Sequence, residues 1–319
     1  MQEQNLSSEV DIRKKKIEDL RGVGEIAYKE KFERTCTIAE ARDKVGQHVK
    51  IAGRIIFKRV MGKFGFIQIR DINAKIQVSV GRNELDEQAY DFYKKMIDIA
   101  DFVGVEGEVY LTQTGEVTVR AEKVTLLSKT LRSLPEKFHG LTDAETIYRQ
   151  RYLDLITNEK SRQVFITRSK IESFIRRYLE DNGFLEVETP VLQTSVSGAS
   201  AKPFFTHHNA LDIECNLRIA TETWLKQCIS AGFDRVFEMG KDFRNEGMDT
   251  SHLQEFTQVE WYASYWNYED NIKFFYKMVN KMLLECLGTT KISYQGQEIE
   301  FASEWDRINY VEKMNEILG

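Results

Sequence analysis

The chain has 319 residues, of which 42% are hydrophobic and 30% charged, and its formal net charge is −5. This balance is typical of a soluble globular protein of about two domains and excludes a mainly disordered chain. No apolar run approaches the roughly 18 to 20 residues that a membrane-spanning helix needs, and the N-terminus lacks the apolar core of a signal peptide. We therefore expect a cytoplasmic protein with no membrane partner.

The charge is unevenly distributed along the chain. Residues 1–134 carry a formal charge of +3 and the remainder carries −8. Residues 50–82 alone hold eight basic side chains and a single acidic one, Asp71. A solvated sheet face can have this composition, but the bias favours a polyanionic partner. The four cysteines are widely spaced, which indicates neither a disulfide frame nor a structural zinc site.

The first half of the chain predicts a helix followed by a small barrel. Residues 9–34 have the pattern of a charged amphipathic helix that ends near Gly22 and Gly24, which we interpret as a peripheral arm. Period-two alternation then predicts five strands, with one helix at residues 84–100 between the third and the fourth. The strands are expected at residues 49–60, 64–71, 74–80, 103–113 and 116–127. Five strands with a helix in this place are typical of an OB-fold.

An OB-fold presents its second and third strands to single-stranded nucleic acid, with aromatic rings for base stacking and basic groups for the backbone. Side chains of both kinds fall on the predicted strands: Arg54, Phe57, Phe64, Phe66 and Gln77. Burial of some of these rings in the barrel core is the structural alternative. The surrounding basic residues favour RNA or single-stranded DNA binding.

The second half predicts an α+β domain with a largely antiparallel sheet. A polar connector at residues 128–148, with Pro135 and Gly140, precedes a long helix at residues 161–183 with a glycine C-cap. A short β-rich run then contains Pro190, which indicates an edge strand or a subunit boundary. Further strands are expected at residues 210–220, 235–246 and 255–266, and helices at residues 222–232 and 268–287.

The segment from Phe243 to Phe256 carries the most chemical information. It contains FRNEG at 243–247 and HLQEF at 252–256. Two strands joined by a loop would bring four side chains to one concave face: Arg244, Glu246, His252 and Phe256. An arginine can clamp a carboxylate or phosphate, and a phenylalanine can stack on a purine. These groups suit ATP bound for attack at its α-phosphate, although spacing alone also fits a surface hairpin with cross-strand charge pairs.

The order of motifs resembles the class II aminoacyl-tRNA synthetases. The long helix, EVETPVL and FRNEG are similar to motifs 1 and 2 of that class, and the barrel is similar to the anticodon-binding domain of its lysine, aspartate and asparagine branch. Four stretches resemble the lysyl-tRNA synthetase family in particular: residues 134–156, SGASAKPF at 197–204, THHNALD at 206–212 and FRNEG itself.

The resemblance implies a domain order and a fold class. It implies a helical arm at 1–36, an OB-fold anticodon-binding domain at 37–128 and a linker at 129–148. Residues 149–319 would form a partial class II catalytic domain with motifs 1 and 2 only. The fold class is thus α+β, with an N-terminal OB-fold β-barrel before an antiparallel-sheet domain.

The resemblance also implies the reaction and its residues. The expected function is ATP-dependent ligation of L-lysine to tRNA(Lys) through lysyl-adenylate. Arg244 and Glu246 would be catalytic and would bind ATP together with His252 and Phe256. L-lysine would be bound by five residues, which are Gly198, Glu222, Arg244, Glu260 and Tyr262. The tRNA anticodon would meet four residues on the barrel, which are Arg54, Phe66, Gln77 and Glu116. The family implies a homodimer formed through residues 164–192.

The sequence departs from the family pattern in three places. Ser251, Leu253 and Gln254 replace the usual arginine, asparagine and proline of the motif 2 loop, and Thr221 and Trp224 stand where proline and tyrosine are common. No glycine-rich motif 3 occurs before Gly319, so the Mg²⁺ ligands are expected beyond that residue and none in this chain. We accordingly expect a truncated enzyme of doubtful activity by itself.

Three alternatives remain open. One is a non-catalytic tRNA- or single-stranded-RNA-binding relic of a synthetase. A second is asparagine or aspartate specificity. A third, a ligase that lysylates a translation factor, is disfavoured because such proteins lack the barrel.

Overall fold

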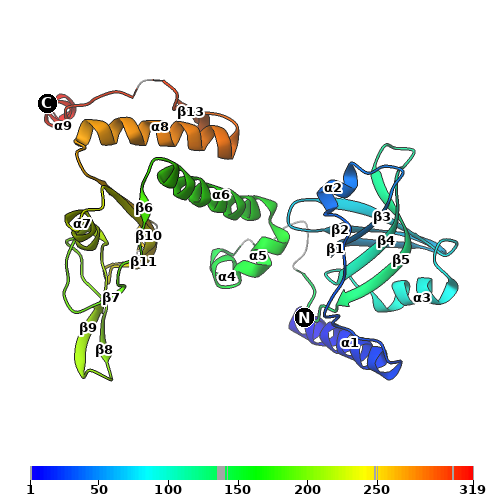
Figure 1. The fold of residues 1–319 in the computed structure, drawn as a ribbon. Coiled ribbons are helices and arrows are strands. Elements are labelled where there is room, and N and C mark those ends of the chain that lie inside the picture. The colour runs from blue at the N-terminus through cyan, green and yellow to red at the C-terminus, as the bar shows by residue number, and fades with distance from the viewer. Residues whose placement is uncertain are drawn as a thin grey trace. The chain divides into compact units, whose positions relative to one another are not determined.

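The computed structural model describes residues 2–134, 141, 143–247, 249, 251–303 and 305–318, with side chains from residue 9 onward. The chain forms two compact units, Met1–Asn158 and Glu159–Gly319. Both units mix helices with strands, so the α+β class predicted from the sequence is confirmed (Figure 1).

The first unit is built on a closed five-stranded barrel. Its strands are β1 (His48–Met61), β2 (Phe64–Arg70), β3 (Lys75–Gly81), β4 (Phe102–Leu111) and β5 (Val117–Ser128). They join in the order β1-β2-β3-β5-β4, and α3 (Glu87–Met96) lies between β3 and β4 in the chain. Along β2, Gly65, Ile67 and Ile69 are buried while their neighbours face outward. This alternation is the reason that the sequence pattern located the strands.

Two helices precede the barrel. The first, α1, spans Gln2–Gly22 and buries Ile17 and Leu20 against Leu126 of β5. The predicted end of this helix near Gly22 and Gly24 is confirmed, whereas its predicted start at residue 9 is wrong, because the helix begins at Gln2. The short helix α2 (Ile38–Arg42) starts with a capping box between Thr37 and Glu40. The T-x-x-E spacing in the sequence is a signal for such a cap, so this helix was predictable but missed.

Two short helices follow the barrel in the first unit. They are α4 (Ala144–Arg149) and α5 (Arg151–Thr157). The predicted connector markers Pro135 and Gly140 lie outside the described residues.

The second unit is organised around the sheet β11-β10-β6. These strands span Glu255–Ala263, Arg235–Phe243 and Leu185–Glu186, with β10 antiparallel to β11 and parallel to β6. Two long helices, α6 (Glu159–Asp181) and α8 (Tyr268–Leu287), share an aromatic core with the sheet (Figure 1). That core includes Phe174, Tyr178, Phe184, Phe237 and Phe274. Gly183 after α6 has a φ of +79°, which fits the predicted glycine C-cap.

A smaller sheet and a helix complete the functional part of this unit. The sheet consists of β7 (Leu192–Gln193), β9 (Ile213–Leu217) and β8 (Phe205–His208), in that order and antiparallel. The β-rich run predicted at 184–192 is therefore divided between two sheets, since β6 pairs with β10 and Leu192 belongs to β7. The β6 strand lies at the edge of its sheet, as expected. The helix α7 spans Glu222–Ser230. The last elements are β12 (Lys291–Tyr294), β13 (Gln297–Glu300) and α9 (Tyr310–Leu318).

In the described part of the chain, no helix combines the length and the apolar character needed to cross a membrane.

Candidate amino-acid and nucleic-acid sites

The loop that leads into α7 gathers the predicted amino-acid-binding residues of the second unit. Its five residues, 218–222, read RIATE. The carbonyl of Ile219 accepts a 3.4 Å hydrogen bond from Nε of Arg244. The hydroxyl of Thr221 donates a 3.0 Å hydrogen bond to Oε2 of Glu260. The same loop therefore touches Arg244 and Glu260, two of the five residues predicted to bind L-lysine.

Gly198 lies against the start of α7, beside Glu222. Its φ of +87° is strained for other residues, and a Cβ there would stand 3.1 Å from Cβ of Ala220 and 3.2 Å from Cβ of Glu222. Glycine therefore permits both the backbone conformation and the close approach. Glu222 is partly buried and pairs with Lys226 one turn along α7.

Glu260 and Tyr262 are neighbours on one face of β11. The Tyr262 hydroxyl donates a 2.8 Å hydrogen bond to Oε1 of Glu260. Burial, together with this bond and the charges of Glu260 and Glu222, raises the pKa of Tyr262 well above its ordinary value. Tyr262 is thus a hydrogen-bond donor at any physiological pH. The structure brings Gly198, Glu222, Glu260 and Tyr262 together.

Arg244 and Phe256, two of the predicted ATP-binding residues, lie together at the loop end of the β10–β11 hairpin. The guanidinium carbon of Arg244 lies over the Phe256 ring at 5.1 Å from the ring centre. The backbone N–H of Arg244 donates to the carbonyl of Gln254 at 2.8 Å, which extends the β10–β11 ladder by one step beyond Phe243.

Glu246 and His252 do not join this pair. The expected strands at 235–246 and 255–266 are shorter in the structure, since β10 ends at Phe243 and β11 spans Glu255–Ala263. Both side chains are exposed in the connecting loop, where His252 contacts the carboxylate of Asp249 at 2.7 Å. The expectation that two strands carry all four side chains to one face is therefore corrected. The backbone leaves the ladder after Arg244, before Glu246.

The sequence missed a buried ionic cluster under the site. Arg218 is only 1% exposed and donates to Glu238, to the carbonyl of Lys241 and to Thr189. It lies across Gly240, where a Cβ would stand 2.2 Å from its Nη2. Arg218 thus ties the EVETPVL run to β10, the strand that carries Arg244. Buried arginines are rare, and the sequence gives no signal that this one is internal.

On the barrel, three of the four predicted anticodon residues lie near one another on the outer surface. Phe66 pairs with Ser79 across β2 and β3, and Gln77 lies two residues before Ser79 on the same face. Nε2 of Gln77 donates to the Thr118 hydroxyl at 3.0 Å, which in turn donates to the carbonyl of Glu116 at 3.2 Å. Phe64 and Phe66 both face outward, with their rings edge to face at 4.9 Å.

Arg54 is placed differently. Its guanidinium donates to the carbonyl of Ala100 at 2.9 Å and lies over the Phe102 ring. The residue that pairs with Phe66 across β1 and β2 is the exposed Arg59. Arg59 is a basic neighbour of the stacking ring that sequence reasoning missed. Counting the alternation back from the tight turn at Gly62 would have found it.

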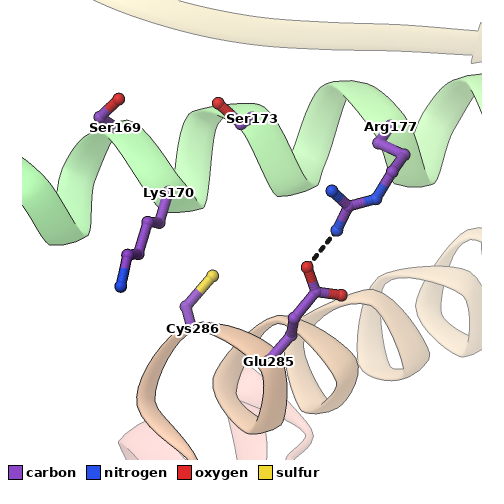
Figure 2. A pocket seen from close by; sticks show the side chains of 6 residues that line it. All are labelled: Ser169, Lys170, Ser173, Arg177, Glu285 and Cys286. Carbon is purple, nitrogen blue, oxygen red and sulfur yellow. Dashed lines mark hydrogen bonds and ion pairs between the residues drawn. The ribbon is translucent and has the colours of Figure 1, made fainter. Parts of the chain in front are cut away.

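A separate cavity of about 350 Å³ lies between α6 and α8 (Figure 2). Ser169, Lys170, Ser173 and Arg177 reach it from α6, and Glu285 and Cys286 reach it from α8 (Figure 2). Arg177 is ion-paired with Glu285 there, and burial raises the pKa of the Cys286 thiol. The cavity contains none of the predicted site residues.

The described residues contain no group of three or more His, Cys, Asp or Glu side chains arranged to hold a metal ion.

Two protein families match these two units. The family described as tRNA synthetases class II (D, K and N) matches residues 143–319, and the OB-fold nucleic acid binding domain matches residues 49–127. The chain therefore belongs to the class II tRNA synthetases of the D, K and N group, with an OB-fold domain before the synthetase domain.

Individual relatives are similar over the whole chain. It is 44% identical to proteins named lysine–tRNA ligase from Bacillus cytotoxicus and from Bacillus anthracis, with 100% of the chain covered in both comparisons. It is also 44% identical to the protein of that name from Lactococcus lactis subsp. cremoris, with 99% covered. The chain spans 66% of the length of these curated relatives.

Proposed function

We propose that this protein takes part in the ATP-dependent ligation of L-lysine to tRNA(Lys) through lysyl-adenylate. One observation carries the proposal. The loop at residues 218–222 holds Arg244 through a carbonyl and Glu260 through a hydroxyl, and it ends at Glu222 beside Gly198. A guanidinium and two carboxylates are thereby grouped around one loop.

This grouping suits a diamino acid. L-Lysine carries two ammonium groups and one carboxylate. A selective site therefore needs anionic partners for the ammonium groups and a cationic partner for the carboxylate. We assign the α-amino group to Glu222 and the backbone at Gly198. We assign the side-chain ammonium to Glu260 and Tyr262, and the carboxylate to Arg244, whose fork geometry suits it.

ATP is assigned to the same hairpin. Phe256 offers a flat face for adenine, and Arg244, which lies over that ring, can bridge the lysine carboxylate and the α-phosphate. Glu246 and His252 complete the proposed ATP contacts, and Arg244 and Glu246 are the proposed catalytic residues. Because both loop side chains are exposed, contact with the nucleotide requires the loop to reorganise.

No covalent nucleophile is needed from the protein. In the proposed reaction the lysine carboxylate forms a bond to the α-phosphorus, pyrophosphate leaves, and a hydroxyl of the terminal tRNA adenosine then takes the lysyl group from AMP. The residues of this chain supply alignment and charge compensation, which are the main terms in phosphoryl-type transfers. Mg²⁺ would neutralise phosphate charge, and its ligands are proposed outside the described residues.

The barrel is proposed to bind the tRNA anticodon. Phe66 would stack on a base, and Gln77 and Glu116 would meet base edges on the same surface. Arg54 stays a prediction, although its engagement with Ala100 and Phe102 makes Arg59 the better placed cation. Base stacking on an aromatic ring contributes about 1–3 kcal/mol per base.

We also propose a cytoplasmic homodimer formed through residues 164–192. Exposed apolar side chains in this region support a second copy as the partner, among them Val164 at 64%, Leu185 at 48% and Leu192 at 44% exposure. Sedimentation velocity tests the dimer, and replacement of Val164 and Leu185 by Asp should shift the protein toward monomer if the proposal is right.

The function is tested by amino-acid-dependent exchange of pyrophosphate into ATP and by binding of tRNA(Lys). Exchange is expected to be slow, since the chain spans 66% of the length of its relatives, and to require lysine rather than asparagine or aspartate. Exchange with asparagine or aspartate instead would contradict lysine specificity. Tight binding of tRNA with neither amino-acid nor ATP binding would favour the alternative, a non-catalytic RNA-binding relic.

A further inference from the structure

The carboxylate of Glu260 is held by three neutral donors that come from two parts of the chain. Oε2 accepts from the Thr221 hydroxyl at 3.0 Å and from Nε2 of Gln258 at 2.7 Å. Oε1 accepts from the Tyr262 hydroxyl at 2.8 Å. Gln258, Glu260 and Tyr262 alternate along one face of β11, and Thr221 approaches from the loop before α7. The carboxylate is therefore fixed along its strand and across it.

The donors leave a defined acceptor position open. An ionised carboxylate offers about four lone-pair positions, two on each oxygen. Two donors occupy Oε2 and one occupies Oε1, so one position on Oε1 remains. Within the described residues no Lys, Arg or His forms an ion pair with Glu260. A half-buried carboxylate with neutral donors and no cation is matched to a cationic ligand that brings one N–H group.

Thr221 donates its side-chain hydrogen bond to Glu260 and does not make the N-cap hydrogen bond that its position would allow. It is the N-cap residue of α7, where a threonine side chain ordinarily accepts a hydrogen bond from the first helical turn. Here its backbone is helical, with φ −94° and ψ −11°, and its side chain makes no cap bond. The residue is only 3% exposed. Its hydroxyl is thus buried in order to bond Glu260, and the helix start goes without a side-chain cap.

We propose that Thr221 and Gln258 are positioning residues that hold the Glu260 carboxylate at one depth in the amino-acid site. The site thereby selects a diamino acid with the chain length of L-lysine over L-ornithine, which is one methylene shorter. The inference rests on the proposed function. A Glu260 carboxylate held by donors on both oxygens cannot move toward the ammonium group of a shorter ligand. A carboxylate that has lost a donor at Oε2 can rotate toward that ammonium group. Thr221 acts through Glu260 and does not touch the ligand.

The test measures equilibrium binding of L-lysine, L-ornithine and ATP by calorimetric titration. Thr221→Val keeps the shape of the side chain and removes the donor, and Thr221→Ser keeps the donor. Gln258→Met keeps the length and removes the second donor, which gives an independent variant should the valine variant fail to fold. Thr257→Val, on the opposite face of β11, is the matched control.

The expected result is a five- to tenfold loss of lysine-over-ornithine preference in Thr221→Val and in Gln258→Met. Thr221→Ser should retain the preference, and ATP binding should be unchanged in all variants. An unaltered preference in both donor-deleted variants would overturn the inference, as would a serine variant as impaired as the valine variant. If the wild-type chain binds ATP but neither amino acid, the proposed function fails and takes the inference with it. If the wild-type chain binds lysine and the variants keep its lysine-over-ornithine preference, only the inference about Thr221 and Gln258 fails, and the proposed function stands.

Discussion

The guanidinium carbon of Arg244 lies 5.1 Å from the centre of the Phe256 ring. The two residues stand where β10 ends and β11 begins, in diagonal positions of the hairpin, since Phe256 pairs with Asp242, two residues before Arg244. The stack leaves the planar fork of Arg244 to face a ligand while its Nε is anchored on Ile219. An arginine in this arrangement depends on its shape as well as its charge.

Arg244→Lys is therefore expected to fail although the charge is kept. A lysine ammonium cannot bond a carboxylate in bidentate fashion and stacks less well on a ring. We expect the affinities for L-lysine and for ATP both to fall by at least about tenfold, which corresponds to about 1.4 kcal/mol. Calorimetric titration measures both, and Arg307→Lys, at an exposed arginine that pairs with Glu269, is the control. Retention of wild-type affinity in Arg244→Lys would show that the charge alone suffices.

On the barrel, Phe66→Leu should weaken binding of tRNA(Lys) by about 1–3 kcal/mol, roughly five- to 150-fold, because leucine is apolar but cannot stack on a base. Phe66→Trp keeps a stacking surface and should retain most of the affinity. Filter binding at a fixed salt concentration measures the effect, since phosphate contacts make the affinity salt-dependent. Equal loss in both variants would indicate that Phe66 only packs against Phe64.

The sequence predicted the barrel more completely than the site. Alternation is a local property, so the inward Gly65 and Ile67 and the outward Phe66 could be recognised residue by residue. Which strand face lies next to which loop is a tertiary property. For that reason Arg59 was overlooked beside Phe66, and the exposed positions of Glu246 and His252 were not foreseen.

The buried cluster around Arg218 shows the same limit. Its partners Thr189, Glu238 and Lys241 come from separate segments, and nothing in the local pattern marks an arginine as internal. The family resemblance supplied the grouping of Glu222, Glu260 and Arg244, whereas the loop that connects them became visible only in the structure.

Gly240→Ala tests the packing of this cluster. The added Cβ would stand 2.2 Å from Nη2 of Arg218 and 3.2 Å from Oε1 of Glu238. Nε and Nη1 of Arg218 are bonded to Lys241, Thr189 and Glu238, which restrains the guanidinium. Overpacking should therefore lower the free energy of unfolding by about 1–3 kcal/mol. All four tryptophans lie in the second unit, so their fluorescence during urea denaturation reports on that unit. Gly247→Ala, with no atom within 4 Å of the new Cβ, should be neutral. Equal stability of the two variants would mean that the Arg218 side chain can shift to accommodate the new methyl group at little cost.

Asp242 gives the cluster a pH dependence. It is fully buried on β10, and neither of its carboxylate oxygens accepts a hydrogen bond within the described residues. Its Oδ1 lies 3.1 Å from Nε of Arg218, but that N–H is directed at the carbonyl of Lys241. Burial raises the pKa of Asp242 to about 6, against the opposing attraction of Arg218.

Because the folded pKa of Asp242 is above the ordinary value of 3.8, the folded state binds the proton more tightly than the unfolded state. The stability that Asp242 contributes should therefore rise as the pH falls from about 7 to about 4, and should be lost as the pH rises through about 6.

Asp242→Asn cannot ionise and lacks this dependence. The stability of the variant relative to the wild type should thus be greater at pH 7 than at pH 4 by about 2 kcal/mol, since the unfolded carboxyl is already partly ionised at pH 4. Urea denaturation followed by tryptophan fluorescence at both pH values measures the difference, with the exposed Asp234→Asn as the control for loss of a charge. A relative stability that increases on acidification would instead mean that Arg218 holds Asp242 ionised and that its pKa is lowered.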